Sequence, residues 1–173
     1  MTCFLSHSWR DEDEAPGEKY QAFARWAREQ EEATGKEVTL WLDKVCIDQN
    51  NIDQSLACLP IFLSGCQTLL IVAGPTYCSR LWCVMEIFTF LRMGGTQDRL
   101  IVYKIDENVS NVLAHFNASQ AECYHRRDRD RLLAIIESGF GDLTIFTKMM
   151  RGMLTAKSAA RSLATRISAA MSV

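Results

Sequence analysis

One glutamate, Glu86, lies in a sequence environment that suits a catalytic carboxylate. Glu86 is surrounded by Trp82, Phe88 and other apolar residues in a segment with helical spacing. Because an unpaired buried charge is costly, such a carboxylate either lines a cleft or pairs with a cation. Desolvation raises the pKa of a buried carboxyl, and groups with shifted pKa values cluster at functional sites. The structural alternatives are an ion pair with Arg80 or Arg92 and simple exposure to solvent.

The residues before Glu86 predict how the chain positions it. Residues 68–73 form a continuous apolar, partly β-branched run, which is typical of a strand buried on both faces of a parallel sheet. Gly74-Pro75-Thr76 breaks this strand, and helical spacing follows as far as Gly94-Gly95. The sequence therefore predicts a strand, a tight turn and a helix that carries one carboxylate two turns from its start. One face of that helix is expected to hold Ser79, Trp82, Cys83, Glu86 and Phe90.

The segment 77–87 resembles the motif of plant-type Toll/interleukin-1 receptor (TIR) domains, in which Tyr, Ser, Trp-Cys-Leu and Glu-Leu follow the third strand. The residues in those places are Tyr77, Ser79, Trp82, Cys83, Glu86 and Ile87, and Val84 replaces the usual Leu. In TIR proteins that hydrolyse NAD, the glutamate at this position is catalytic. The resemblance therefore implies that Glu86 is a catalytic residue.

Two earlier segments also resemble TIR domains. Residues 4–11 are similar to the opening strand and its polar loop, and residues 41–49 to the second strand and the BB loop. The part Cys-Ile-Asp-Gln is also similar to the TIR-related heterokaryon-incompatibility domains of fungi. Ligands of open α/β sheets bind outside the carboxyl ends of the strands. We therefore expect substrate contacts from Ser6, His7, Ser8, Trp9, Arg10, Trp41, Asp43, Lys44, Trp82 and Cys83.

Each of these residues also has a structural interpretation. His7 can satisfy the end of its strand by hydrogen bonding instead of touching substrate. The rings of Trp9, Trp41 and Trp82 can face a cationic nicotinamide or belong to the core. Asp43 and other polar residues of the second loop can simply form turn hydrogen bonds.

The remaining pattern predicts the fold class. Helices are expected at 16–34, at 52–65 with a start, kink or division at Pro60, near 109–113, and from about 126 to a stop at 139–141. Strands are expected at 2–6, 38–42, 68–73 and 99–105, with a short edge strand around 114–116. This arrangement is a flavodoxin-like three-layer α/β/α fold with a mainly parallel five-stranded sheet. The TIR-like domain would span residues 1–140.

A C-terminal helical extension is expected at 141–173. Its apolar residues step by fours and threes, as a heptad seam does: Met149, Met153, Ala156, Ala160, Leu163, Ile167 and Ala170. In order of preference, this helix packs on its own domain, connects to further sequence, or mediates self-association.

Composition excludes several function classes. A chain of 173 residues with 48% hydrophobic residues suits one globular domain with a core. The net charge of −2 gives no electrostatic case for nucleic acid as a partner. The alternating charges of residues 126–131 favour a solvated first helical turn over a nucleic-acid patch. No apolar run is long enough to span a bilayer, and we expect no signal peptide and no membrane partner.

The seven cysteines carry no metal-site pattern. Their number is odd, none forms a C-x-x-C pair, and several lie in apolar runs where free Cys behaves as a small hydrophobe. Reduced thiols and a cytoplasmic location are therefore favoured over disulfides or a metal site.

One carboxylate is enough to cleave NAD⁺. Glycosidases need a general acid because an alkoxide leaves poorly, whereas nicotinamide leaves a cationic pyridinium as a neutral molecule. A fixed negative charge then stabilises the oxocarbenium-like ribose. The chain has no Gly-x-Gly-x-x-Gly or P-loop motif, so redox and P-loop nucleotide chemistry are disfavoured.

We therefore expect an NAD⁺ glycohydrolase, with NAD⁺ as substrate, no cofactor and no metal. Its products would be nicotinamide and ADP-ribose or a cyclic ADP-ribose. The resemblance further implies a role in immune or cell-death signalling and activation by self-association through TIR–TIR contacts. The alternative is a non-catalytic TIR interaction module that assembles through the loop after the second strand. A domain that binds NAD⁺ without cleaving it is a third possibility.

Overall fold

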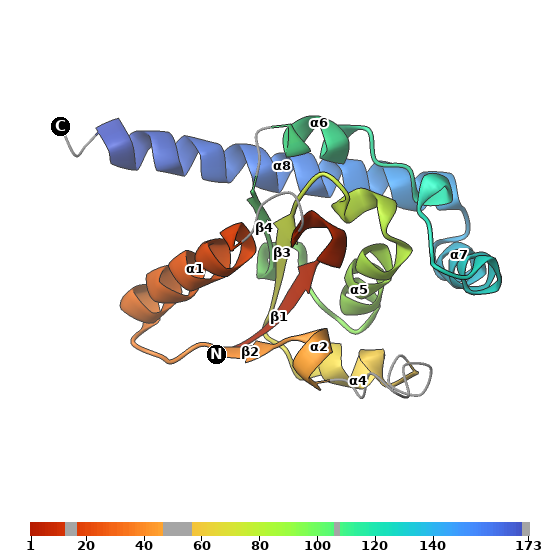
Figure 1. Cartoon of the computed structure of the whole chain (residues 1–173), viewed down its shortest axis with the longest axis horizontal. Helices are drawn as coiled ribbons and strands as arrows, with labels where there is room; N and C mark the ends of the chain where they lie inside the picture. Colours follow the sequence, from red (N-terminus) through yellow and green to blue (C-terminus); the bar gives the residue numbers. More distant parts are fainter. Residues whose placement is uncertain (13–16, 47–56, 106–107, 171–173) are drawn as a thin grey trace.

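Four parallel strands form one sheet in the part of the chain that the structure describes. In this computed structural model the described residues are 1–12, 17–46, 57–105 and 108–170; side chains are described up to residue 156, except those of 12, 18, 44 and 45. The strands are β1 (Thr2–His7), β2 (Thr39–Trp41), β3 (Thr68–Ala73) and β4 (Leu100–Lys104). Their order is β2-β1-β3-β4, and all three pairings are parallel (Figure 1).

The two faces of the sheet pack against different sets of helices. On one face, Cys3, Leu5, Leu70 and Val72 pack with Trp26 of α1 (Glu18–Thr34). On the other face, alternate strand residues such as Phe4, Leu69 and Ile71 join a larger core with residues of helices between positions 59 and 154. All six residues of β3 are buried, as its continuous apolar run predicts. The three-layer α/β arrangement is thus confirmed.

The prediction of a fifth strand around 114–116 was wrong. Ala114 is the last residue of α6 (Val109–Ala114), whose end is capped by the N–H of His115 donating to the carbonyl of Asn111. Phe116 is buried and packs edge-on against Phe146, so its side chain joins the core. Local helical hydrogen bonds and burial of Phe116 therefore take the place of sheet pairing in this segment.

The helices on the larger face begin and end near their expected boundaries. Pro60 lies in the first turn of α4 (Leu59–Ser64), where its missing N–H costs nothing. The carboxylate helix is α5 (Leu81–Arg92), and α7 (Arg126–Phe140) ends at Gly141 with φ of 80°, as expected. A short helix, α2 (Asp43–Cys46), follows β2. The part of the 52–65 prediction that covers residues 52–56 lies outside the described residues.

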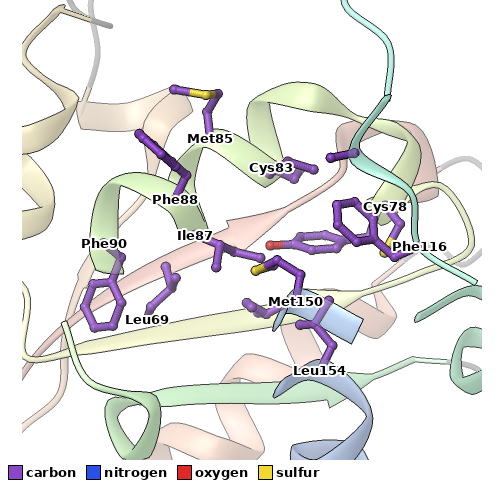
Figure 2. Packing of buried hydrophobic residues seen from close by; sticks show 14 of the residues in the cluster. Leu69, Cys78, Cys83, Met85, Ile87, Phe88, Phe90, Phe116, Met150 and Leu154 are labelled. Atoms are coloured by element: carbon purple, nitrogen blue, oxygen red, sulfur yellow. The ribbon is translucent and has the colours of Figure 1, made fainter. Parts of the chain in front are cut away.

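The last helix, α8 (Leu143–Ala170), packs on the domain along its first half. Phe146, Met150, Met153 and Leu154 are buried in the same core as α5, whereas Ala156 is exposed. Figure 2 shows Met150 and Leu154 among the core side chains, beside Ile87 of α5. Of the predicted seam residues whose side chains are described, Met153 is buried, Met149 is partly buried against the same core, and Ala156 is exposed. No helix among the described residues is long and apolar enough to cross a membrane.

Candidate active site

The strand order creates a switch point between β1 and β3. From β1 the chain proceeds to β2 on one side, and the next strand, β3, is placed on the other side of β1. The loops that leave β1 and β3 therefore diverge at their carboxyl ends, which is where open α/β sheets bind ligands. Ser6 and His7 end β1, and Tyr77 and α5 follow β3, so these residues surround the switch point.

A buried hydroxyl links the end of β1 to the carboxylate of α5. The Oγ of Ser6 donates to Oε2 of Glu86 over 2.5 Å, and the same oxygen lies 2.7 Å from the phenolic oxygen of Tyr77. Ser6 has one proton to give, so the Tyr77 hydroxyl donates to Ser6 while Ser6 donates to Glu86. Ser6 and Tyr77 are fully buried, and Glu86 is partly exposed. The three groups form a hydrogen-bonded chain that runs from the core to the protein surface.

The environment of Glu86 favours its neutral form. Desolvation raises its pKa to about 8, and the nearby charge of Asp43 acts in the same direction. The hydrogen bond from Ser6 opposes both effects by stabilising the carboxylate. Although the side chain keeps some solvent exposure, protein atoms surround the carboxyl closely, which explains why desolvation is the largest cause. The sequence-based expectation of a desolvated carboxyl with a raised pKa is consistent with this environment.

The loops after β1 and β2 meet beside Glu86. The indole Nε1 of Trp9 donates to Oδ2 of Asp43 over 3.1 Å. The His7 ring lies edge-on to Trp9, with ring centroids 4.1 Å apart. Trp9 is partly exposed, so this pair places an accessible aromatic ring and a carboxylate at the edge of the site.

A second set of hydrogen bonds fastens the β1 loop to the β3 loop. Buried Asp11 accepts from the backbone N–H of Thr76 (2.8 Å) and from its hydroxyl (2.7 Å), and the Ser8 hydroxyl lies 2.6 Å from Thr76 Oγ1. A Cβ on Gly74 would collide with the carboxyl of Asp11. Glycine is therefore required at this position for the two loops to approach each other.

Cys83 and Lys19 complete the support of the β1 end. The buried thiol of Cys83 donates to the carbonyl of His7 over 3.3 Å, and burial raises its pKa well above the ordinary value. Nζ of Lys19, on α1, is buried and donates to the carbonyl of Ser8 over 2.6 Å. Both contacts hold backbone carbonyls at the point where the chain leaves the strand. Cys83 thus supports the backbone at the end of β1, and its expected substrate contact stays a prediction.

The remaining predicted residues do not all converge on Glu86. Trp41 stacks on Phe4 with ring centroids 4.4 Å apart and also contacts Phe62, so its ring takes part in core packing. Trp82 lies beside Met85 in a separate pocket, which Glu86 does not line. Arg10 is exposed on the short helix η1 (Trp9–Glu12). Lys44 belongs to α2, and its side chain lies outside the described residues.

Sequence reasoning missed four contributors: Asp11, Lys19, Thr76 and Tyr77. Tyr77 belongs to the TIR-like motif, yet the motif gives it no role, and its hydrogen bond to Ser6 is what places it in the site. Asp11 lies in the expected polar loop after the first strand, and Thr76 lies in the turn expected after the strand at 68–73. Their mutual contact spans 65 positions and has no local signal.

No metal centre is indicated at this site. The described residues contain no group of three or more His, Cys, Asp or Glu side chains placed to hold an ion. The cysteines in this part of the chain are all free thiols.

Comparisons with protein-family models, with curated proteins and with solved structures returned no match for this chain. Its function therefore has to be argued from the geometry of the site and from the motif in its sequence.

Proposed function

We propose that this chain is a TIR-type NAD⁺ glycohydrolase in which Glu86 is the catalytic residue. The observation that carries the proposal is the hydrogen bond from buried Ser6 to Glu86 at the switch point of the sheet. This contact fixes a single carboxyl in a desolvated position where α/β folds bind ligands. The motif around Glu86, described above, suggests NAD⁺ as the substrate.

The proposed reaction breaks the bond between C1′ of the ribose and the nicotinamide nitrogen. The bonding electron pair goes to the pyridinium nitrogen, so nicotinamide leaves as a neutral molecule. Ionised Glu86 stabilises the positive charge that develops on the ribose. Water then attacks C1′ and loses a proton, which gives ADP-ribose; attack by an adenine nitrogen of the same molecule gives the cyclic product.

The surrounding groups suit this reaction. A cationic substrate next to Glu86 lowers the pKa of the carboxyl by charge pairing, so binding favours the reactive anion. Nζ of Lys19 already lies 6.0 Å from the centroid of the Trp9 ring, and the remaining exposed part of the ring can contact the pyridinium. Asp43 places a second negative charge near the same cation, and its repulsion of Glu86 is relieved when the cation binds.

The test is nicotinamide release by the purified full chain, alone and when clustered through a fused dimerising tag. We expect release that increases on clustering and falls at least about a hundredfold in Glu86→Ala, as is typical when a preorganised charge is removed. Glu137→Ala is the matched control, because Glu137 is an exposed acid on α7. Release that persists in Glu86→Ala would overturn the proposed role of Glu86. No release in either state would favour the non-catalytic interaction module.

A further inference from the structure

A pocket of about 330 Å³ lies on another side of the helix that carries Glu86. Its walls come from α4, α5 and α7, which lie on the side of the sheet that holds the larger core (Figure 1). Met85 projects from the opposite side of α5 to Ile87, which faces the strands (Figure 2). The pocket is therefore separate from the switch point, and the described site residues contribute only Trp82 to it.

The interior of the pocket is apolar. Leu59, Met85, Phe88 and Leu132 line it and are buried, and Trp82 adds a partly exposed aromatic wall. Such a lining excludes water from the interior and favours hydrocarbon, at about 0.8 kcal/mol for each buried methylene in general. Met side chains also adapt to irregular ligands because they are flexible and polarizable.

The rim of the pocket carries an excess of positive charge. Arg92 at the end of α5 and Arg131 on α7 both line the pocket and are exposed, and Asp128 is the one acidic residue among the described lining residues. Asp128 lies one turn before Arg131 on α7, so it offsets part of the charge of that arginine. Arg92, on the other helix, is left to attract an anion.

We propose that this pocket binds a small amphipathic anion, namely an alkyl carboxylate whose chain enters between α4, α5 and α7 and whose head group meets Arg92 and Arg131. A volume of 330 Å³ holds about ten non-hydrogen atoms if each occupies roughly the 30 Å³ of a water molecule. The chain is therefore of about eight to ten carbons by the same measure. Planar guanidinium groups suit a carboxylate because they donate two parallel hydrogen bonds.

The experiment is calorimetric titration of the full chain with decanoate and decyltrimethylammonium, each below its micelle concentration, and with decan-1-ol below its solubility limit. We expect one saturable site for decanoate, with binding at least tenfold weaker for the alcohol and the cation. Arg92→Ala and Arg131→Ala should each weaken decanoate by about threefold, the range of an exposed charge pair. Arg127→Ala is the control, because Arg127 is an exposed arginine of α7 that is not among the lining residues.

A variant that fills the entrance of the pocket tests where the ligand binds. Ile135 lines the pocket and is 40% exposed, so Ile135→Trp occupies the entrance without entering the core. We expect decanoate binding to be lost in this variant, with its fold checked by circular dichroism, and to be unchanged in Glu86→Gln. Absence of saturable decanoate binding would overturn the site, and binding that survives Ile135→Trp would overturn its location. Equal binding of the alcohol or the cation, or no loss in either arginine variant, would overturn the anion preference.

Discussion

Ser6 and Glu86 are 80 positions apart in the chain, yet the hydroxyl of one lies 2.5 Å from the carboxyl oxygen of the other. The contact joins the next-to-last residue of β1 to the second turn of α5. It also connects the carboxyl to the buried hydroxyl of Tyr77, since both share Ser6 as a partner. Several properties of the protein depend on this one hydroxyl.

Ser6→Ala should raise the pKa of Glu86 further above its value of about 8. The Ser6 hydrogen bond favours the carboxylate, so its removal leaves the desolvation of Glu86 less compensated. The Tyr77 hydroxyl also loses its partner, and a buried unsatisfied group costs about 1–3 kcal/mol. Carbon-detected NMR titration of the Glu86 carboxyl measures the pKa, and urea unfolding measures the stability. Ser64→Ala, at an exposed position, should change neither; an unchanged Glu86 pKa in Ser6→Ala would contradict the contact.

Glu86 should make the protein less stable as pH rises from about 4.5 to about 8. In this range the folded state keeps the proton that the unfolded state has released, so the free energy of unfolding falls with pH. Below 4.5 and above 8 the proton count of Glu86 is the same in both states, and its contribution is constant. The slope is at most about 1.4 kcal/mol per pH unit.

The measurement for this second prediction is urea unfolding of the wild type and of Glu86→Gln between pH 4 and pH 9. The amide cannot titrate, so the difference between the two proteins isolates Glu86 from every other group. The variant should become the relatively more stable protein as pH rises. A difference that stays constant with pH would show that Glu86 titrates normally.

If the proposed reaction is correct, kcat/KM for NAD⁺ should rise with pH and level off above about 8. The ionised carboxyl is the reactive form, and kcat/KM reports the pKa of the free enzyme. The pH dependence of kcat should have a lower midpoint, because the bound cation favours the anion. A rate that falls with pH across this range would indicate that the neutral acid is the working form.

Gly74→Ala should destabilise the protein and separate the loops after β1 and β3. Its Cβ would collide with the carboxyl of Asp11, which is held in place by two bonds from Thr76. Overpacking of this kind costs about 1–3 kcal/mol. Gly152→Ala is the matched control, because Gly152 lies in α8 with no heavy atom near its Cβ position. This second change should stabilise the protein by about 0.5–1 kcal/mol through helix propensity. Thermal unfolding compares the two; equal effects would contradict the collision.

The thiols should react with a disulfide reagent at very different rates in the native protein. Burial raises the pKa of Cys3 and of Cys78 to about 12 and that of Cys66 to about 11, so few thiolates form near neutral pH. Cys46 is exposed and should be labelled first. Mass spectrometry of peptides after brief labelling gives the order, and the buried thiols should react only after unfolding. Early labelling of Cys78 would show that the β3 loop opens readily.

The elements with the strongest local patterns were predictable from sequence. Residues 68–73 form a buried strand because six consecutive apolar or β-branched residues suit a position between two layers of helices. The helix expected at 16–34 is present as α1, and its Trp26 is fully buried against the sheet. The edge strand at 114–116 failed because a weak local pattern could not compete with the burial of Phe116 next to Phe146.

The contacts within the site could not be predicted from local sequence patterns. Ser6 meets Glu86 only because β1 pairs with β3 in one register, with Ser6 opposite Ile71, and because α5 then returns over the same strands. The tryptophans divide in the same way: Trp41 is fixed by its stack on Phe4, whereas Trp9 reaches Asp43. The spacing of these residues does not indicate which tryptophan packs in the core and which lies at the site.

The burial of α8 constrains when this protein can finish folding during synthesis. Met150 and Leu154 fill the same core as Leu69 and Ile87, whose own segments are made much earlier. Until residue 154 has left the ribosome, the apolar underside of α5 and the neighbouring strands stays uncovered. A chain that stops before this segment is therefore expected to leave part of its apolar core open to water.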